Sequence, residues 1–228
     1  MELKYNKCKQ DYINLKNKFK RNIIKIADKE FSGAGVLLIE KNDDDYYIIL
    51  FENAKKPNYF EDLGGGIDDN DIKNNNILEH TALREALEES CGLLNFLDIN
   101  SAIETIKNNY IDVDHKGIYY RCFLLCLDAN IVNEKDFQTN LKLIKKDPKM
   151  LSFMKEMNNV TRFSFNQLKT DIKNITNGTF KTVDINGNKC NINRRITNIL
   201  KNLDVHQLKV AKDYSFNNIK LHSNYLYC

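Results

Sequence analysis

The chain has 228 residues, of which 42% are hydrophobic and 29% are charged. These proportions exclude a disordered chain, and the longest apolar runs, at 36–39 and 46–51, are far shorter than the roughly 20 residues of a membrane-spanning helix. The formal charge of +3 is the difference between 34 bases and 31 acids, which is too small by itself to indicate nucleic-acid binding. We therefore expect one globular domain without membrane attachment.

Two features of the composition concern the source and the compartment. Lys, Asn and Ile occupy 28, 32 and 24 positions, a bias typical of A/T-rich genes, which suggests a microbe, a parasite or a large DNA virus as the source. The six cysteines are scattered without a Cys-x-x-Cys pair, and the four histidines do not stand near them at zinc-ligand spacing. No secretory signal is visible either, so we expect a reduced, intracellular and cytoplasmic protein.

Residues 1–30 predict a basic amphipathic helix. This segment holds nine bases and four acids. Apolar residues recur in it at steps of three and four positions, namely Tyr5, Tyr12, Leu15, Phe19, Ile23 and Ile26. Two interpretations remain open: a helix packed on the domain with solvated lysines, and a surface that faces RNA or polyphosphate.

The rest of the chain alternates strands and helices without repeats, which favours one mixed α/β domain. Runs rich in β-branched and aromatic residues predict strands at 33–40, 46–51, 118–127 and 163–165. Helical periodicity predicts a helix at 77–91, and further helices are expected within the Lys-rich region 130–157 and at 194–203. The first two strands are expected to form a hairpin around a five-residue connection, 41–45, and residues 206–228 are expected to be a C-terminal tail.

Three carboxylates are predicted to converge on the helix at 77–91. Glu85, Glu88 and Glu89 stand at i, i+3 and i+4, so they share one face within about 6 Å of each other. The only nearby base, Arg84, is adjacent in sequence and is therefore expected to point elsewhere around the helix. Mg²⁺ or Mn²⁺ offsets such repulsion well, because hard cations prefer oxygen ligands. A solvated acidic face is the alternative.

A glycine triplet precedes this helix and is expected to lie in a loop. Gly64, Gly65 and Gly66 lack a β-carbon, so the backbone there can approach a ligand closely. A glycine-rich loop followed by an acidic helix suits a metal-bound diphosphate. The three glycines are therefore candidate substrate-binding residues.

The stretch from Gly65 to Leu93 resembles the box of the Nudix hydrolase family, G-x5-E-x7-R-E-U-x-E-E-x-G-U, in which U is aliphatic. The first glycine matches, and the matches on the predicted helix are Arg84, Glu85, Glu88 and Glu89. The flanking segments resemble the family as well, so that the resemblance covers residues 31–205. It implies a Nudix-like α/β/α sandwich with a mixed β-sheet.

Three details depart from the family pattern. Asp71 stands where the box has Glu, twelve residues instead of seven separate it from Arg84, and Ser90-Cys91 occupy a one-residue position before the last glycine. The two insertions fall in a loop and at a helix end, so we expect the carboxylate face to be intact. They leave the role of Asp71 open.

The resemblance implies metal-dependent hydrolysis of the diphosphate linkage in a nucleoside diphosphate derivative. It makes Glu85, Glu88 and Glu89 ligands of Mg²⁺ or Mn²⁺, and it makes Arg84 the residue that orients them. Glu85 is also a candidate general base. Glu156, which precedes Arg162-Phe163, is a second candidate base, and an ordinary surface glutamate is the alternative interpretation of it.

The resemblance leaves the substrate open between three classes: a small nucleotide derivative, a 5′-capped RNA bound through the basic N-terminal helix, and a diphosphoinositol polyphosphate. A domain that binds nucleotide or RNA without cleaving it, as a sensor or scaffold, is the alternative to an enzyme. Three retained helix carboxylates favour the enzyme. Family members are often dimers, so a homodimer is a further expectation.

Overall fold

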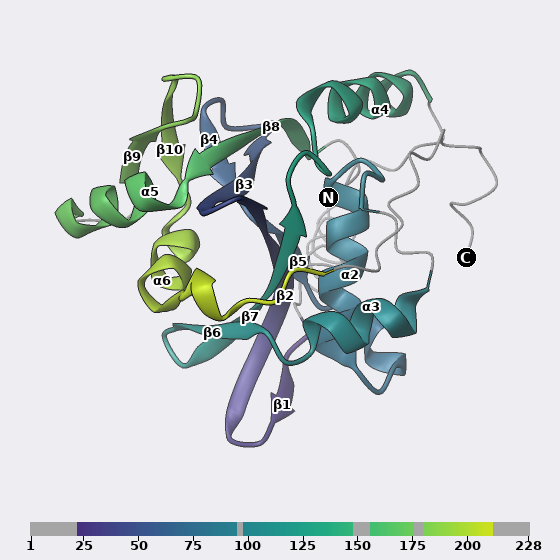
Figure 1. Ribbon diagram of the computed structural model, residues 1–228. Helices are drawn as coiled ribbons and strands as arrows, with labels where there is room; N and C mark the ends of the chain where they lie inside the picture. Colours follow the sequence, from purple (N-terminus) through teal and green to yellow (C-terminus); the bar gives the residue numbers. More distant parts are fainter. Residues whose placement is uncertain (1–21, 95–97, 148–155, 176–179, 212–228) are drawn as a thin grey trace, which may run out of the picture.

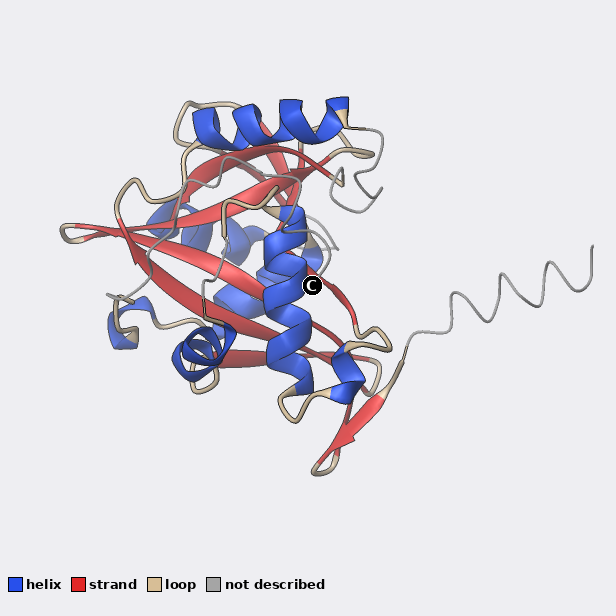
Figure 2. Cartoon of the chain, turned by 90° about the vertical axis from the view of Figure 1, so that its right-hand side faces the viewer, coloured by secondary structure: helices blue, strands red, loops and turns tan. Residues whose placement is uncertain are grey.

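The computed structural model describes residues 22–94, 98–147, 156–175 and 180–211, which are coloured in Figure 1. In this part of the chain ten strands form one mixed sheet. Two hydrophobic cores lie on the two faces of the sheet, and in Figure 2 helices lie both in front of the strands and behind them. The mixed α/β sandwich expected from the sequence is therefore confirmed.

The hairpin predicted near the start of the domain is present. Strands β2 (Lys29–Asn42) and β3 (Asp45–Asn53) pair antiparallel, with Leu38 opposite Ile49 and Asn42 opposite Asp45. The connection is two residues long, where the sequence suggested five, because both strands extend into the polar segment. Asp43 takes the left-handed conformation there (φ 52°), which Asp tolerates better than most residues.

Strand β2 lies at the centre of the sheet and has four partners, of which the short β1 (Ile24–Ile26) pairs with its first residues. One edge pairs in parallel with β7 (Ile118–Asp128). The other edge pairs with β3 over its second half and with β5 (Leu63–Gly66) over its first half. The glycine triplet is therefore part of a strand, and the expectation of a loop at 64–66 is wrong.

The remaining strands extend the sheet on both sides of this centre, in the order β6-β7-β2-β3-β4-β10-β9 with β1, β5 and β8 paired outside that path. They are β1 (Ile24–Ile26), β4 (Tyr59–Glu61), β6 (Tyr110–His115), β8 (Met157–Ser164), β9 (Phe180–Val183) and β10 (Lys189–Ile192). The strand predicted at 163–165 is thus the end of a longer one. Phe165 begins a helix because Ser164 caps it by accepting the N–H of Gln167.

The helices divide between the two cores. Helices α2 (Ile77–Glu89), α3 (Ile99–Ile106) and α4 (Glu134–Lys146) contribute buried residues to one core. Helices α5 (Phe165–Asp171) and α6 (Arg194–Asn202) contribute to the other. No helix in the described ranges is long and apolar enough to cross a membrane.

The two ends of the domain differ from the expectation. Residues 1–21 lie outside the described residues, but the helix predicted over 1–30 is wrong for residues 22–30, because β1 pairs with the start of β2 there. At the other end, Leu208 and Val210 pack on the second core and the N–H of Ala211 donates to the carbonyl of Cys126. Packing therefore continues past residue 205, and residues 212–228 lie outside the described range.

Candidate active site

Helix α2 carries the predicted carboxylates and is fixed by its buried side. Leu78, Ala82 and Ala86 are completely buried in the first core. The helix ends at Glu89, two residues earlier than expected, in a Schellman-type turn in which the N–H of Gly92 donates to the carbonyl of Leu87 (2.9 Å). The inserted residues before Gly92 therefore lie beyond the helix and leave its carboxylate face intact.

The carboxylate of Glu89 is bound by the neighbouring strand. Its Oε2 accepts the backbone N–H of Gly64 on β5 at 2.6 Å, and the residue is only 7% exposed. A backbone N–H is a common partner for a carboxyl oxygen that is removed from water. Glu89 is thus oriented by β5 as well as by its own helix.

The carboxylate of Glu85 lies over Gly65 of the same strand. A β-carbon on Gly65 would be 2.6 Å from Cδ of Glu85, closer than real contacts allow. The same addition on Gly66 would meet only Ser32 O at 3.8 Å. Packing against Glu85 thus explains the glycine at position 65 without any ligand. The substrate-binding role of Gly64, Gly65 and Gly66 stays a prediction.

Arg84 joins the carboxylates, contrary to the expectation that it points elsewhere around the helix. Its Nη1 forms ion pairs with Glu85 Oε1 (2.9 Å) and Glu88 Oε2 (3.2 Å). Its Nη2 donates to the carbonyl of Gly66 at 2.9 Å. The long side chain curls back over the helix surface, which adjacency in sequence does not prevent.

Asp71, whose role the inserted residues had left open, binds the guanidinium of Arg84. Its two oxygens accept Nε and Nη2 of Arg84 at 3.3 and 3.0 Å. The Thr81 hydroxyl and the N–H of Asp68 donate to it as well, each at 3.0 Å, and Asp71 is 3% exposed. The inserted residues after Asp71 continue a short 3₁₀ helix, Asp71–Lys73, and then connect to α2 without separating Asp71 from Arg84.

The cluster favours the protonated form of its acids. Burial raises the pKa of Glu88 to about 7, opposed by Arg84 and assisted by the charge of Glu85. Burial also raises the pKa of Glu89 well above its usual range, again with a contribution from Glu85, although the bond from Gly64 opposes the shift. The pKa of Glu85 is raised by burial too, against the influence of Arg84. Such a site stabilises any added positive charge.

Glu156 lies at the edge of this cluster. Its negative charge is one of the causes that raise the pKa of Glu85, so the two carboxylates are within electrostatic range. Its side chain is 45% exposed, and Lys55 approaches it at 3.9 Å. The structure therefore places Glu156 near the helix carboxylates and in contact with solvent.

The donor set fits Mg²⁺ or Mn²⁺ by its chemistry, although it does not form a closed cage. Within the described residues, no three His, Cys, Asp or Glu side chains are arranged to hold a metal ion. Arg84 Nη1 instead contacts both Glu85 and Glu88. Mg²⁺ is usually bound through only one or two carboxylates together with water and substrate oxygens, and the role of Glu85, Glu88 and Glu89 as its ligands stays a prediction.

Four further residues, to which the sequence assigned no role, connect to the cluster. Glu61 and Asp62, just before the glycines, both contribute to raising the pKa of Glu89. Asp62 in turn binds Arg195 and Tyr120. More than 50 residues separate Asp62 from Tyr120 and more than 130 separate it from Arg195, so only tertiary structure brings them together.

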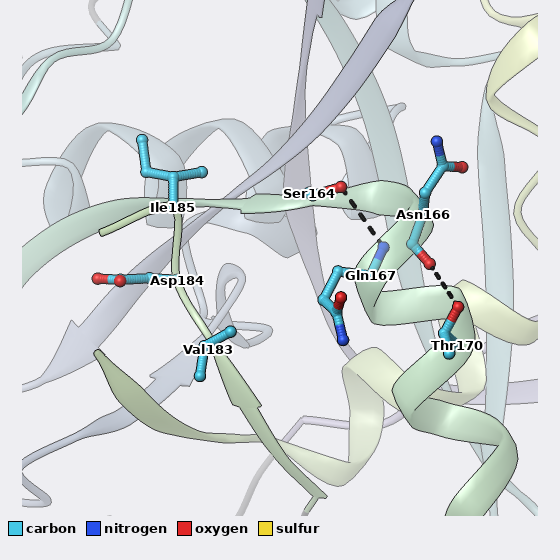
Figure 3. Close-up of a pocket in the computed structure, with 7 residues that line it drawn as sticks. All are labelled: Ser164, Asn166, Gln167, Thr170, Val183, Asp184 and Ile185. Atoms are coloured by element: carbon cyan, nitrogen blue, oxygen red, sulfur yellow. Dashed lines mark hydrogen bonds between the residues drawn. The ribbon is translucent and has the colours of Figure 1, made fainter. Parts of the chain in front are cut away.

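A hollow of about 410 Å³ lies elsewhere on the surface and shares no residue with the cluster. Figure 3 shows its lining, which comes from the end of β8, from α5, and from the end of β9 with the two residues after it: Ser164, Asn166, Gln167, Thr170, Val183, Asp184 and Ile185. The carboxylate of Asp184 is already used by the backbone N–H groups of Asn186 and Asn188. The predicted site residues on α2 and β5 therefore all lie outside this hollow.

No protein-family model matches the chain, and no curated protein matches it in sequence. Among solved structures, an Ap4A hydrolase of C. elegans, in a binary complex, is 14% identical, with 59% of this chain and 80% of that chain covered and a TM-score of 0.35.

A second solved structure is the NUDIX domain of Shewanella oneidensis NrtR complexed with ADP ribose. It is 11% identical, with 64% of this chain and 79% of that chain covered and a TM-score of 0.35. NrtR complexed with a 27mer DNA is 13% identical, with 60% and 52% covered and a TM-score of 0.33.

Proposed function

We propose that this protein is a Mg²⁺- or Mn²⁺-dependent hydrolase that cleaves the diphosphate linkage of a nucleoside diphosphate derivative. The observation that carries the proposal is the convergence of Glu85, Glu88 and Glu89 on one helix face, all with raised pKa values. Beside them lies Arg84, whose guanidinium is bound by the buried Asp71. The resemblance of the Gly65–Leu93 stretch to the Nudix box supports the same reaction.

Each residue of the cluster has a role in this proposal. Glu85, Glu88 and Glu89 would hold the cation, which when bound lowers the pKa of a water and neutralises charge on the diphosphate. Arg84, anchored by Asp71, orients the first two carboxylates. The backbone N–H of Gly64 orients the third.

The attacking water needs a base within reach. Glu156 is our first candidate, because it is solvent-exposed and electrostatically coupled to the cluster, and Glu85 is the second. A carboxylate oxygen of either residue would accept the proton of the water. Replacing Glu156 by Gln would separate the two, because a large fall in kcat with unchanged cation binding would assign the base to Glu156.

The experiment that tests the proposal is product release from a panel of diphosphate compounds in the presence of Mg²⁺ or Mn²⁺. The panel holds an NDP-sugar, a dinucleoside polyphosphate, a noncanonical NTP, free cap analogue, capped RNA and a diphosphoinositol polyphosphate. We expect cleavage that requires the cation and is lost in Glu85→Gln. Glu79→Gln is the matched control, because Glu79 lies in the first turn of the same helix, away from the box carboxylates.

The panel also discriminates the alternatives. Cleavage confined to the long capped RNA, with a steep fall in binding as salt rises, would identify RNA as the substrate. It would also indicate that a basic surface of the protein binds the RNA backbone. Binding of nucleotide without cleavage of any compound would contradict the hydrolase and favour a sensor or scaffold. The basic segment that would serve RNA lies within residues 1–21, outside the described part of the chain.

A further inference from the structure

The chain changes partner strand at Asp62. Glu61, the last residue of β4, pairs with Phe51 of β3, whereas Leu63, the first residue of β5, pairs with Val36 of β2. A single residue therefore separates β4, which pairs with β3, from β5, which pairs with β2. The position of β5, and with it the position of the glycines that contact the carboxylate cluster, depends on how this corner is held.

Asp62 is held by two side chains from distant parts of the chain. Its carboxylate is 0% exposed. Arg195, at the start of α6, donates Nε and Nη2 to Oδ1 at 2.9 and 2.6 Å, and the hydroxyl of Tyr120 donates to Oδ2 at 2.9 Å. The guanidinium also lies 4.1 Å from the centre of the Tyr120 ring. A fully buried charge needs such partners, so the corner is fixed on both sides.

The Tyr120 hydroxyl transmits this restraint to the site. It lies between Gly35 of β2 and Gly64 of β5, and a β-carbon on either glycine would overlap it. The N–H of the same Gly64 donates to Glu89 Oε2 at 2.6 Å. A continuous series of contacts therefore runs from Arg195 through Asp62, Tyr120 and Gly64 to the last carboxylate of the cluster.

Asn193 holds the other acid of the corner. Its Nδ2 donates to Glu61 Oε2 at 2.9 Å, and its Oδ1 caps α6 by accepting the N–H of Arg195 at 2.8 Å. Asn53 donates to the second oxygen of Glu61 at 2.6 Å. Two residues at the start of α6 thus bind two consecutive acids beside the glycines.

We propose that Arg195 and Asn193 are positioning residues for the candidate active site. Arg195 holds Asp62, which binds the Tyr120 hydroxyl beside Gly64, and the N–H of Gly64 orients Glu89. Asn193 holds Glu61 and caps the helix that carries Arg195. The segment β9-β10-α6, far from the box in sequence, is then part of what the site needs. The functional half of this inference rests on the proposed function, in which Glu89 is a cation ligand.

Three variants of the full chain test the positioning role. Arg195→Lys keeps the charge but loses the fork that binds Asp62, and Tyr120→Phe removes only the hydroxyl between the glycines. Arg194→Lys is the matched control, because Arg194 is the exposed neighbour of Arg195. Hydrogen exchange of the Gly64 amide is measured by NMR relative to the core amides of β2 and β7, and Mn²⁺ binding is measured by the loss of the free-ion EPR signal.

We expect the Gly64 amide of Arg195→Lys and Tyr120→Phe to exchange about tenfold faster relative to the core amides, because its acceptor is no longer held in place. Mn²⁺ should bind about tenfold more weakly in the same variants, the usual effect of losing a residue that orients a ligand. Arg194→Lys should match the wild type in both measurements. An unchanged ratio of Gly64 to core exchange in both variants would overturn the positioning role.

The two measurements separate this inference from the proposed function. A wild-type protein that binds no Mn²⁺ and cleaves nothing would end the hydrolase proposal, whereas the exchange of Gly64 would still decide whether the start of α6 positions Glu89. Faster Gly64 exchange together with unchanged Mn²⁺ affinity and kcat would overturn the functional half of the inference. A uniform rise in exchange at all amides would show a structural role only and would also overturn it.

Discussion

Replacing Gly65 by alanine should displace Glu85 while leaving the fold in place. The added β-carbon would lie 2.6 Å from Cδ of Glu85 and 2.8 Å from its Oε2, where ordinary contact begins at 3.4 Å. The carboxylate must therefore move by about 0.8 Å or more, because the backbone of β5 is paired with β2 and cannot yield as easily. Misplacing a reacting group by about 1 Å costs on the order of a hundredfold in rate.

The stability of this variant should change little. Gly65 is not among the residues with positive φ, so alanine fits the backbone, and a compatible Gly→Ala change contributes about 0.4–1 kcal/mol of stability through the unfolded chain. We expect kcat on the best substrate of the panel to fall about a hundredfold, with a thermal midpoint within a few degrees of the wild type.

The control for this prediction is Gly66→Ala. A β-carbon on Gly66 would meet only Ser32 O, at the ordinary distance of 3.8 Å, so this variant should leave Glu85 in place and lose far less activity than Gly65→Ala. Steady-state kinetics at saturating Mn²⁺ and thermal denaturation of both variants are the measurements. Equal activity in the two alanine variants would refute the reasoning that Gly65 is required by Glu85.

Three further predictions concern Glu89, Glu88 and Asp71 of the same cluster. Glu89→Gln should abolish activity with little loss of fold, because it weakens cation binding while it relieves repulsion, and full activity in a folded variant would contradict its role as a ligand. The folded-state pKa of Glu88, about 7, lies above its reference value of 4.5, so the stability that this group contributes is present below pH 4.5 and is lost as pH rises through 7. The loss is at most about 3 kcal/mol, and thermal midpoints in EDTA should show a slope over this window that Glu88→Gln removes. Asp71→Ala should cost about 3 kcal/mol of stability, because it leaves Arg84 without its buried partner, and a denaturant titration with an unchanged midpoint would show that the anchor is dispensable.

Local pattern was sufficient for most of the secondary structure. The central hairpin, strand β7 and helices α2, α4 and α6 all lie where the sequence predicted them, because each contributes apolar residues to one of the two cores. The convergence of Glu85, Glu88 and Glu89 is equally local, since it follows from helical spacing alone. No pattern predicted α3, whose eight residues are a short amphipathic run in a polar region.

Other features depended on partners that are distant in the chain. Residues 24–26 form a strand despite their helical spacing, because they pair with the start of β2. The glycine triplet forms a strand because it pairs with the edge of β2. Arg84 turns toward the acids because Asp71 and the carbonyl of Gly66 receive its guanidinium. Each of these outcomes depends on hydrogen bonds between residues that are distant in the sequence, which local propensity cannot predict.

The sequence by itself therefore determined which acids can act together, since neighbours on one helix face are set by the rise and turn of the helix. Tertiary structure alone decided how those acids are held. Gly64 orients Glu89 and lies against Tyr120, while Arg195 binds Asp62 across a separation of 133 residues. The physical reason is burial: a carboxylate removed from water must find donors wherever the fold supplies them, and the fold supplies them from β5, β7 and α6.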